Sequence, residues 1–177
     1  MTTTSNFPHR AHVVAVSSGT GRTWRNPHQV ALMCLMAYST ALGWQAQLVS
    51  YPLYRAVGAA DFAAYHARYK EAIPWVVVVP GFVCFLAGAA FPWTRPRAVS
   101  LAAAALVSVA SLTALLSTVA WAIPAHDKLD RAGQSAATID RLLQANLLRS
   151  GALTVGMLTL AACVVRQINR NSAAPES

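Results

Sequence analysis

Charged residues are scarce in this chain, at 11% of its 177 residues, whereas ordinary soluble domains carry about 25%. Hydrophobic residues make up 55% of the sequence, and long stretches contain no Asp, Glu, Lys or Arg. A helix of about 20 such residues crosses the hydrocarbon core of a bilayer. The shortage of charge therefore excludes an ordinary soluble domain and indicates a protein whose main solvent is lipid.

Cysteine is also scarce, and its placement disfavours two classes of site. The three cysteines, Cys34, Cys84 and Cys163, lie far apart and inside apolar stretches. Because no two of them form a CxxC pair, the sequence disfavours a disulfide oxidoreductase and a zinc site built on thiolates. We interpret all three as buried structural thiols.

A secretory signal is not apparent, because no apolar segment lies close to a basic N-terminus. Residues 1–28 are polar and rich in Ser and Thr. We expect them to form a flexible cytoplasmic tail.

The chain does contain four apolar windows, at about residues 30–51, 72–93, 98–123 and 142–165. Three of them lack every charged residue, and the fourth contains only Arg149. Each is long enough to form a membrane-spanning helix. We therefore predict an all-α integral membrane protein, with a four-helix bundle over residues 29–167.

Two polar connections separate the windows, and each carries a histidine. In residues 52–71, the stretch DFAAYHARYKE places three aromatic side chains and His66 on one helical side. This pattern predicts a short amphipathic helix at the membrane surface. The connection over residues 124–141 carries His126, and we expect a second short amphipathic segment there.

The distribution of charge predicts the orientation. Four crossings place both termini and the short basic turn at residues 94–97 on one side of the membrane. Basic residues divide evenly between the two sides, but Glu176 is the only acidic residue on the terminal side. By the positive-inside rule we place this side, including a tail at residues 168–177, in the cytoplasm. We expect a plasma-membrane protein, and we read the scattered basic residues as topology signals rather than as a nucleic-acid-binding face.

Three polar side chains of the windows should meet the histidines at the extracytoplasmic end: Gln47, Asn146 and Arg149. An arginine at mid-bilayer depth costs about 2.5 to 3.5 kcal/mol unless something compensates its charge. Snorkelling or a salt bridge would do so, and the candidate partners are Asp127, Asp130 and Asp140. Alternatively, Arg149 and Asn146 build a pocket for an anion or oxyanion. Gln47 either bonds a neighbouring helix or contributes to that pocket.

For His66 and His126 three roles stay open. Either can act as a general acid or base, because the pKa of histidine lies near neutrality. Together they can bind copper or iron if Glu71, Asp127 or Asp130 completes the shell. They can also be structural, since they lie far apart in sequence without a local metal-binding spacing. The sequence identifies no cofactor.

The order of these residues also resembles a known family. The residues that carry the resemblance are Gln47, Tyr51-Pro52, Tyr65-His66 with Tyr69, Pro124-Ala125-His126, and Asn146 followed by Arg149. On four membrane helices, over about residues 30–165, this order is similar to the small membrane proteins grouped with the fungal anthrone oxygenases, many of which have no assigned function. The resemblance implies a membrane oxidase or oxygenase of secondary metabolism that uses dioxygen on a small molecule.

A non-catalytic role is the alternative hypothesis. In it the protein is a small membrane subunit or scaffold that binds a partner or lipid through its amphipathic connections. A transporter is disfavoured, because the sequence shows neither a clear inverted repeat nor a chain of acidic residues. Homo-oligomerisation is compatible with each of these functions.

Overall fold

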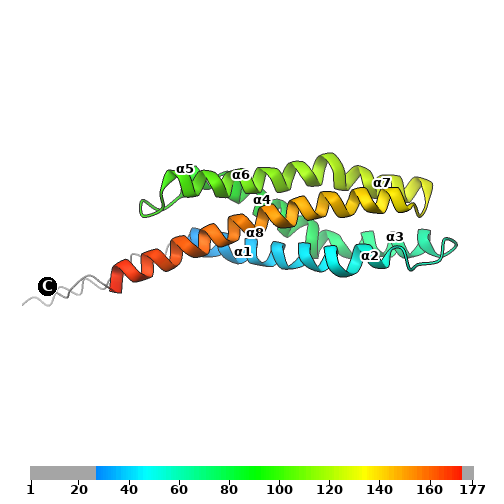
Figure 1. Cartoon of the computed structure of the whole chain (residues 1–177), viewed down its shortest axis with the longest axis horizontal. Helices are drawn as coiled ribbons and strands as arrows, with labels where there is room; N and C mark the ends of the chain where they lie inside the picture. The colour runs from blue at the N-terminus through cyan, green and yellow to red at the C-terminus, as the bar shows by residue number, and fades with distance from the viewer. Residues whose placement is uncertain (1–26, 173–177) are drawn as a thin grey trace, which may run out of the picture.

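The computed structural model describes residues 27–172, which form an all-α structure of four long helical rods (Figure 1). The first rod consists of α1 (Pro27–Gln45), η1 (Ala46–Ser50) and α2 (Tyr51–Leu53). The second consists of α3 (Phe62–Ile73), η2 (Pro74–Val78), α4 (Val79–Ala89) and α5 (Phe91–Thr94). The third consists of α6 (Leu101–Ser117), η3 (Thr118–Ala122) and α7 (Ile123–Ala132), and the fourth is α8 (Ala136–Ser172). The η segments are π-helical turns.

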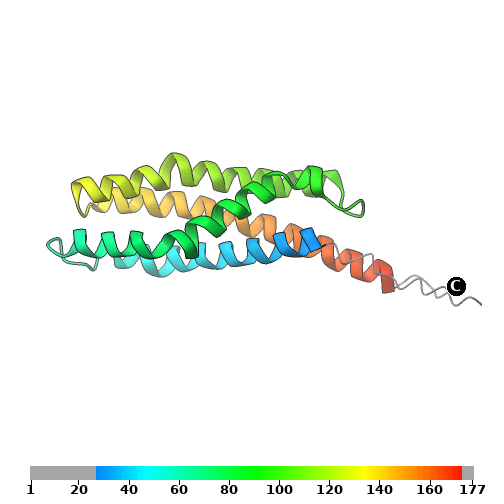
Figure 2. The ribbon, with the colours of Figure 1, turned by 180° about the vertical axis from the view of Figure 1, so that it is seen from behind.

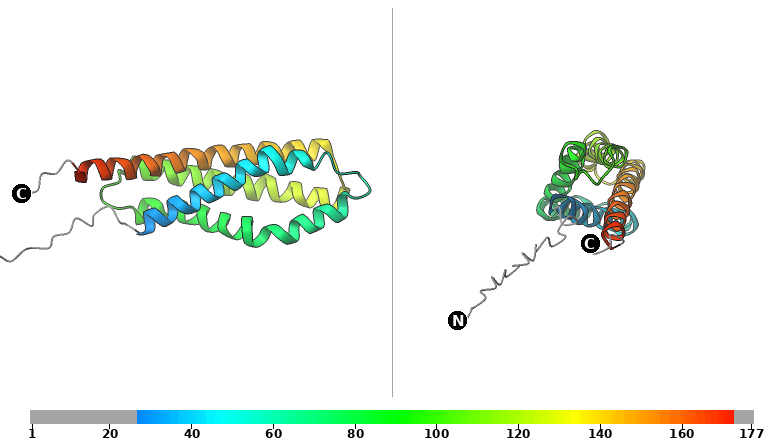
Figure 3. Two further views of the ribbon diagram at one scale, coloured as in Figure 1. Left: turned by 90° about the horizontal axis from the view of Figure 1, so that it is seen from below. Right: turned by 90° about the vertical axis from the view of Figure 1, so that its left-hand side faces the viewer.

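The rods run back and forth and close into a ring. The first rod packs against the second and fourth, and the third also packs against the second and fourth. The ring is visible in the end-on view of Figure 3. The start of α1 and the end of α8 lie at the same end of the bundle as α5 (Figures 1 and 2). The opposite end carries α2, α3 and α7, and we call it the α3–α7 end.

Three prolines explain the three π turns. Proline has no backbone N–H, and its ring clashes with the carbonyl four residues earlier. For Pro52, Pro80 and Pro124 that carbonyl belongs to a residue within η1, η2 and η3, respectively. A π turn accommodates one extra residue and moves the carbonyl away from the ring. Each rod that contains such a proline is thus widened locally instead of being broken.

Three helices are long and apolar enough to cross a membrane: Phe62–Ala89, Leu101–Ala132 and Ala136–Arg170. The outer surface is correspondingly apolar, with Trp75 and Trp93 80% and 83% exposed. An apolar outer face of this kind is expected for contact with lipid. These features suggest an integral membrane protein. The first rod is helical over its expected range but is not among the three candidate spans.

The amphipathic segments differ from the prediction of separate surface helices. Both α3 and α7 continue directly from the apolar part of their rods through a π turn. They stay in line with the rods because α3 packs against α7, which buries Phe62, His66 and Leu129 between them and their neighbours. The fourth helix is also longer at both ends than its apolar window.

Close packing in the middle of the bundle depends on small residues. A Cβ atom added at Gly43 would overlap the hydroxyl of Ser150, and one added at Gly88 would overlap that of Ser111. These contacts allow α1 to approach α8, and α4 to approach α6, more closely than larger residues would permit. Of the three thiols expected to be buried, Cys84 is fully buried, Cys163 is half-buried, and the expectation is wrong for Cys34, which is exposed.

The predicted tails fall largely outside the described residues. Residues 1–26 and 173–177 are not described, so the expected tail at 1–28 is seen only at its last two residues. Those two residues already belong to α1, and the first part of the expected tail at 168–177 belongs to α8.

Candidate functional site

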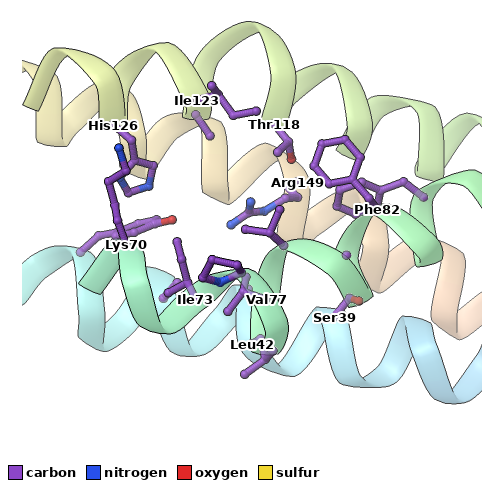
Figure 4. A pocket seen from close by; sticks show the side chains of 18 of the residues that line it. Ser39, Leu42, Lys70, Ile73, Val77, Phe82, Thr118, Ile123, His126 and Arg149 are labelled. Carbon is purple, nitrogen blue, oxygen red and sulfur yellow. The ribbon is translucent and has the colours of Figure 1, made fainter. Parts of the chain in front are cut away.

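A cavity of about 280 Å³ lies between the four rods toward the α3–α7 end (Figure 4). Most of its wall is apolar, and its larger polar side chains are Gln45, Tyr51, Tyr69, Lys70, His126, Asp127 and Arg149. All three π turns contribute to the wall, through residues such as Ala46, Pro74 and Thr118. The proline-dependent widening of three rods at one level is therefore a structural cause of the cavity.

Two helical pairs of residues form a hydrogen-bonded chain beside the cavity. On α3, His66 and Lys70 are four residues apart, and on α7, His126 and Asp130 have the same spacing, so each pair shares a helix face. The Nε2 atom of His66 lies 3.0 Å from Nδ1 of His126. The Nδ1 atom of His66 lies 2.6 Å from Oδ1 of Asp130, whose Oδ2 accepts a hydrogen bond from Lys70. His126 lines the cavity, whereas His66 lies behind it and is only 1% exposed.

An aromatic cluster fixes the two imidazole rings. Tyr54 is completely buried and meets both histidines edge to face, with ring centroids 5.6 Å from His66 and 6.4 Å from His126. Phe62 stacks on His66 with centroids 5.5 Å apart and planes inclined by 11°. Burial raises the pKa of the Tyr54 phenol well above its ordinary value, so this ring stays neutral. The cluster leaves neither imidazole free to turn over without repacking its neighbours.

The loop that carries Tyr54 is held in place by the opposite loop. The side-chain amide of Gln134 donates to the carbonyl oxygens of Tyr54 and Val57, at 2.7 and 2.9 Å. A second link runs from the loop to α8, through the ion pair of Arg55 with Asp140. These contacts join both connections at the α3–α7 end.

Arg149 extends from α8 into the cavity (Figure 4). Its guanidinium donates to Oδ1 of Asn146, which is completely buried. The amide nitrogen of Asn146 donates in turn to the Gly43 carbonyl at 2.9 Å and to Oε1 of Gln47 at 2.8 Å. Asn146 thus positions Arg149 directly, and Gln47 in turn positions Asn146, where the first rod meets the fourth.

Arg149 has no carboxylate partner among residues 27–172. Of the aspartates expected near it, Asp130 pairs with Lys70 and His66, and Asp140 pairs with Arg55. Asp127 lines the same cavity but forms no ion pair with the guanidinium. The cavity therefore presents an uncompensated cation to whatever occupies it.

The structure brings the five candidate residues together around one cavity, but in two layers. His126 and Arg149 line the cavity, whereas His66 contacts His126 from behind, Asn146 contacts Arg149, and Gln47 contacts Asn146. Two aromatic residues of the first rod also turn toward protein: Tyr51 is buried, and Trp44 donates to Thr154 at 3.0 Å.

Sequence reasoning missed three residues of the site. Lys70 and Tyr69 line the cavity, and Tyr54 joins the aromatic cluster. For Lys70 a signal existed, because its four-residue spacing from His66 matches the spacing of His126 and Asp130. Nothing local distinguishes Tyr54, since its place is set by the loop contacts.

The arrangement of the side chains does not fit a copper or iron site at His66 and His126, which was one of the roles compatible with the sequence. Within residues 27–172, no three His, Cys, Asp or Glu side chains converge as metal ligands. His66 directs its two nitrogens in opposite directions, one toward His126 and the other toward Asp130. Asp130 therefore lies on the far side of the imidazole and does not complete a shell with the facing nitrogens. We derive no chemical step through a metal.

Comparisons of the chain with protein-family models, with curated proteins and with solved structures found no match.

Proposed function

We propose that this protein is a membrane-embedded oxidase or oxygenase that acts with dioxygen on a small molecule. The observation that carries the proposal is the presence of the His126 imidazole and the Arg149 guanidinium in the wall of one largely apolar cavity, where Arg149 has no carboxylate partner within residues 27–172. A base and a cation that line the same cavity suit a reaction in which an uncharged substrate loses a proton and becomes an anion.

The proposal includes a four-helix transmembrane bundle in the plasma membrane, with both termini cytoplasmic. Trp75 and Trp93 are exposed and 18 positions apart, which corresponds to a rise of about 27 Å, close to the thickness of a hydrocarbon core. Tryptophans at such positions are typical of the two membrane interfaces. In this proposal His66 lies beyond the interface on the extracytoplasmic side, and the cavity extends from there toward the hydrocarbon.

The chemistry follows from the placement of the two cavity groups. A substrate with an acidic methylene beside a conjugated ketone loses a proton to His126, and the electron pair of the C–H bond moves onto the ketone oxygen. Arg149, held by Asn146, stabilises that oxyanion. The enolate transfers electrons to dioxygen and forms a C–O bond, which gives a hydroperoxide after protonation. Loss of water then produces a second carbonyl, so that the balance is R₂CH₂ + O₂ → R₂C=O + H₂O.

Dioxygen uptake and product formation by the purified protein test this function. The resemblance noted in the sequence makes anthrone the first substrate to assay, with a protein-free blank to subtract autoxidation. We expect His126→Gln and Arg149→Gln each to lower the rate by about 10²-fold or more. Arg141→Gln, at an exposed position on the same helix, is the matched control and should leave the rate unchanged. Unchanged turnover in both cavity variants would contradict the proposal.

The alternative, a non-catalytic membrane subunit, makes the opposite prediction for these variants. It requires that the protein copurifies with another membrane component and that both cavity substitutions leave that association intact.

A further inference from the structure

We propose that Asp130 and His66 form a proton relay that sets the tautomer of His126 and withdraws the proton taken from the substrate. Both are positioning residues, because each acts on the cavity through His126. The tautomer follows from the hydrogen-bond geometry, whereas its consequence for turnover rests on the proposed function.

The relay begins with a carboxylate, which only accepts hydrogen bonds when ionised. Lys70 donates to one oxygen of Asp130, and a cation at this position favours the ionised form. The other oxygen lies 2.6 Å from Nδ1 of His66. This nitrogen must therefore carry a proton and donate it to the carboxylate. In a neutral imidazole the second nitrogen, Nε2, then holds a lone pair and can only accept.

The same logic extends from His66 to His126. Nε2 of His66 lies 3.0 Å from Nδ1 of His126, and because the first can only accept, the second must donate. The remaining nitrogen of His126, Nε2, is thereby left without a proton. The chain of bonds thus presents an unprotonated nitrogen on the side chain that lines the cavity, as a general base requires.

The aromatic cluster keeps the relay in this orientation. Phe62 stacks on one face of His66, while Tyr54 meets both imidazoles edge to face. Because His66 is almost fully buried, water cannot readily replace either of its partners. Turning that ring over would place carbon atoms where both hydrogen bonds now form.

The relay also gives the withdrawn proton a destination. When Nε2 of His126 takes a proton, Nδ1 can pass its own proton to Nε2 of His66, so that one N–H bond breaks and another forms. The positive charge then lies on His66, against the Asp130 carboxylate that Lys70 also contacts, rather than on His126, which shares the cavity wall with Arg149. The Asp130 side chain is 33% exposed, whereas that of His66 is 1% exposed, so the relay leads from the cavity toward water.

Nitrogen-15 NMR of histidine-labelled full-length protein in nanodiscs tests the tautomers directly. Protonated and unprotonated ring nitrogens give separate signals, and His66→Gln and His126→Gln variants assign them. We expect both imidazoles to be neutral with the proton on Nδ1. Asp130→Ala should move the proton of both rings to Nε2 and lower kcat by about 10²-fold with little change in KM. Asp61→Ala, which removes an exposed acid that forms no side-chain capping hydrogen bond at the start of α3, should change neither quantity.

Two results would overturn the relay: a proton on Nε2 of His126 in the unsubstituted protein, or an unchanged tautomer in Asp130→Ala. The first does not depend on Asp130→Ala, so the test holds even if that variant does not fold. Failure of the proposed function looks different. In that case the spectra follow the expectation, but neither the unsubstituted protein nor any variant consumes dioxygen above the blank.

Discussion

Replacing Arg149 with methionine separates the role of its charge from any role in folding. Methionine keeps a long unbranched side chain in the cavity wall but removes the guanidinium. A cavity cation without a carboxylate partner should contribute little net stability, because desolvation opposes its hydrogen bond. We therefore expect Arg149→Met to fold almost as stably as the unsubstituted protein while losing activity.

The magnitude follows from two opposing contributions to the free energy of unfolding. Removing the charge from a membrane helix gains up to about 2.5 to 3.5 kcal/mol, and less if water reaches the guanidinium. Losing its hydrogen bond to Asn146 costs about 1.5 to 3 kcal/mol, because a buried acceptor loses a charged donor. At mid-bilayer depth the difference between the two lies between a loss of about 0.5 and a gain of about 2 kcal/mol. For a chain of this length, that corresponds to a shift in Tm of at most about 8 °C.

Thermal unfolding in detergent, followed by circular dichroism, measures this shift alongside the anthrone-dependent uptake of dioxygen. Arg141→Met is the control, because it removes an exposed positive charge from the same helix. A fall in Tm of more than about 12 °C, equivalent to about 3 kcal/mol or more, would refute the reasoning. It would show that Arg149 is needed to hold the helices together and that its charge is compensated in the folded state.

Three further predictions test the packing, the membrane placement and the donor set. Gly88→Ala should lower the free energy of unfolding by about 1 to 3 kcal/mol, because the added methyl group would overlap Ser111. Gly151→Ala should raise it by up to about 1 kcal/mol, because the added methyl group meets nothing within 4 Å. Thermal unfolding compares the two variants, and equal effects would contradict the described packing. Single-tryptophan variants that retain Trp75 or Trp93 should be quenched most strongly by lipids brominated near the headgroup, and strongest quenching by bromine near the bilayer centre would exclude an interfacial position. Dialysis against a chelator should leave the rate of dioxygen uptake unchanged, and loss of activity restored by copper or iron would show that a metal shell forms after all.

Much of the architecture could be predicted from the sequence, because helices that contact lipid are almost free of charged residues over their whole length. The apolar windows identified the four helices, and the polar side chain of Gln47 was correctly expected to bond a neighbouring helix or join the site. The helix ends were harder, because α3 and α7 contain charged residues and yet continue the rods. Their continuity depends on contacts between segments far apart in the sequence, which no local pattern reports.

Which residues form the site could be predicted better than how they are arranged. Polar residues in apolar helices are costly and therefore conspicuous, which is why Asn146 and Arg149 could be selected. Which of them faces the cavity depends on helix rotation, and the π turns alter that rotation. The link from Asp130 through His66 to His126 joins two helices, so only the folded arrangement reveals it.

The π turns have a consequence for how such a site can arise in evolution. One residue added to an α-helix rotates everything beyond it by about 100°. A single inserted codon near Pro124 would therefore have turned the face of α7 relative to α6, while leaving the packing of α6 against α8 intact. Deleting one residue from η3 should reverse that step and swing His126 away from Arg149. A catalytic site could thus be gained or lost by insertions and deletions of single residues in a bundle whose remaining core does not change.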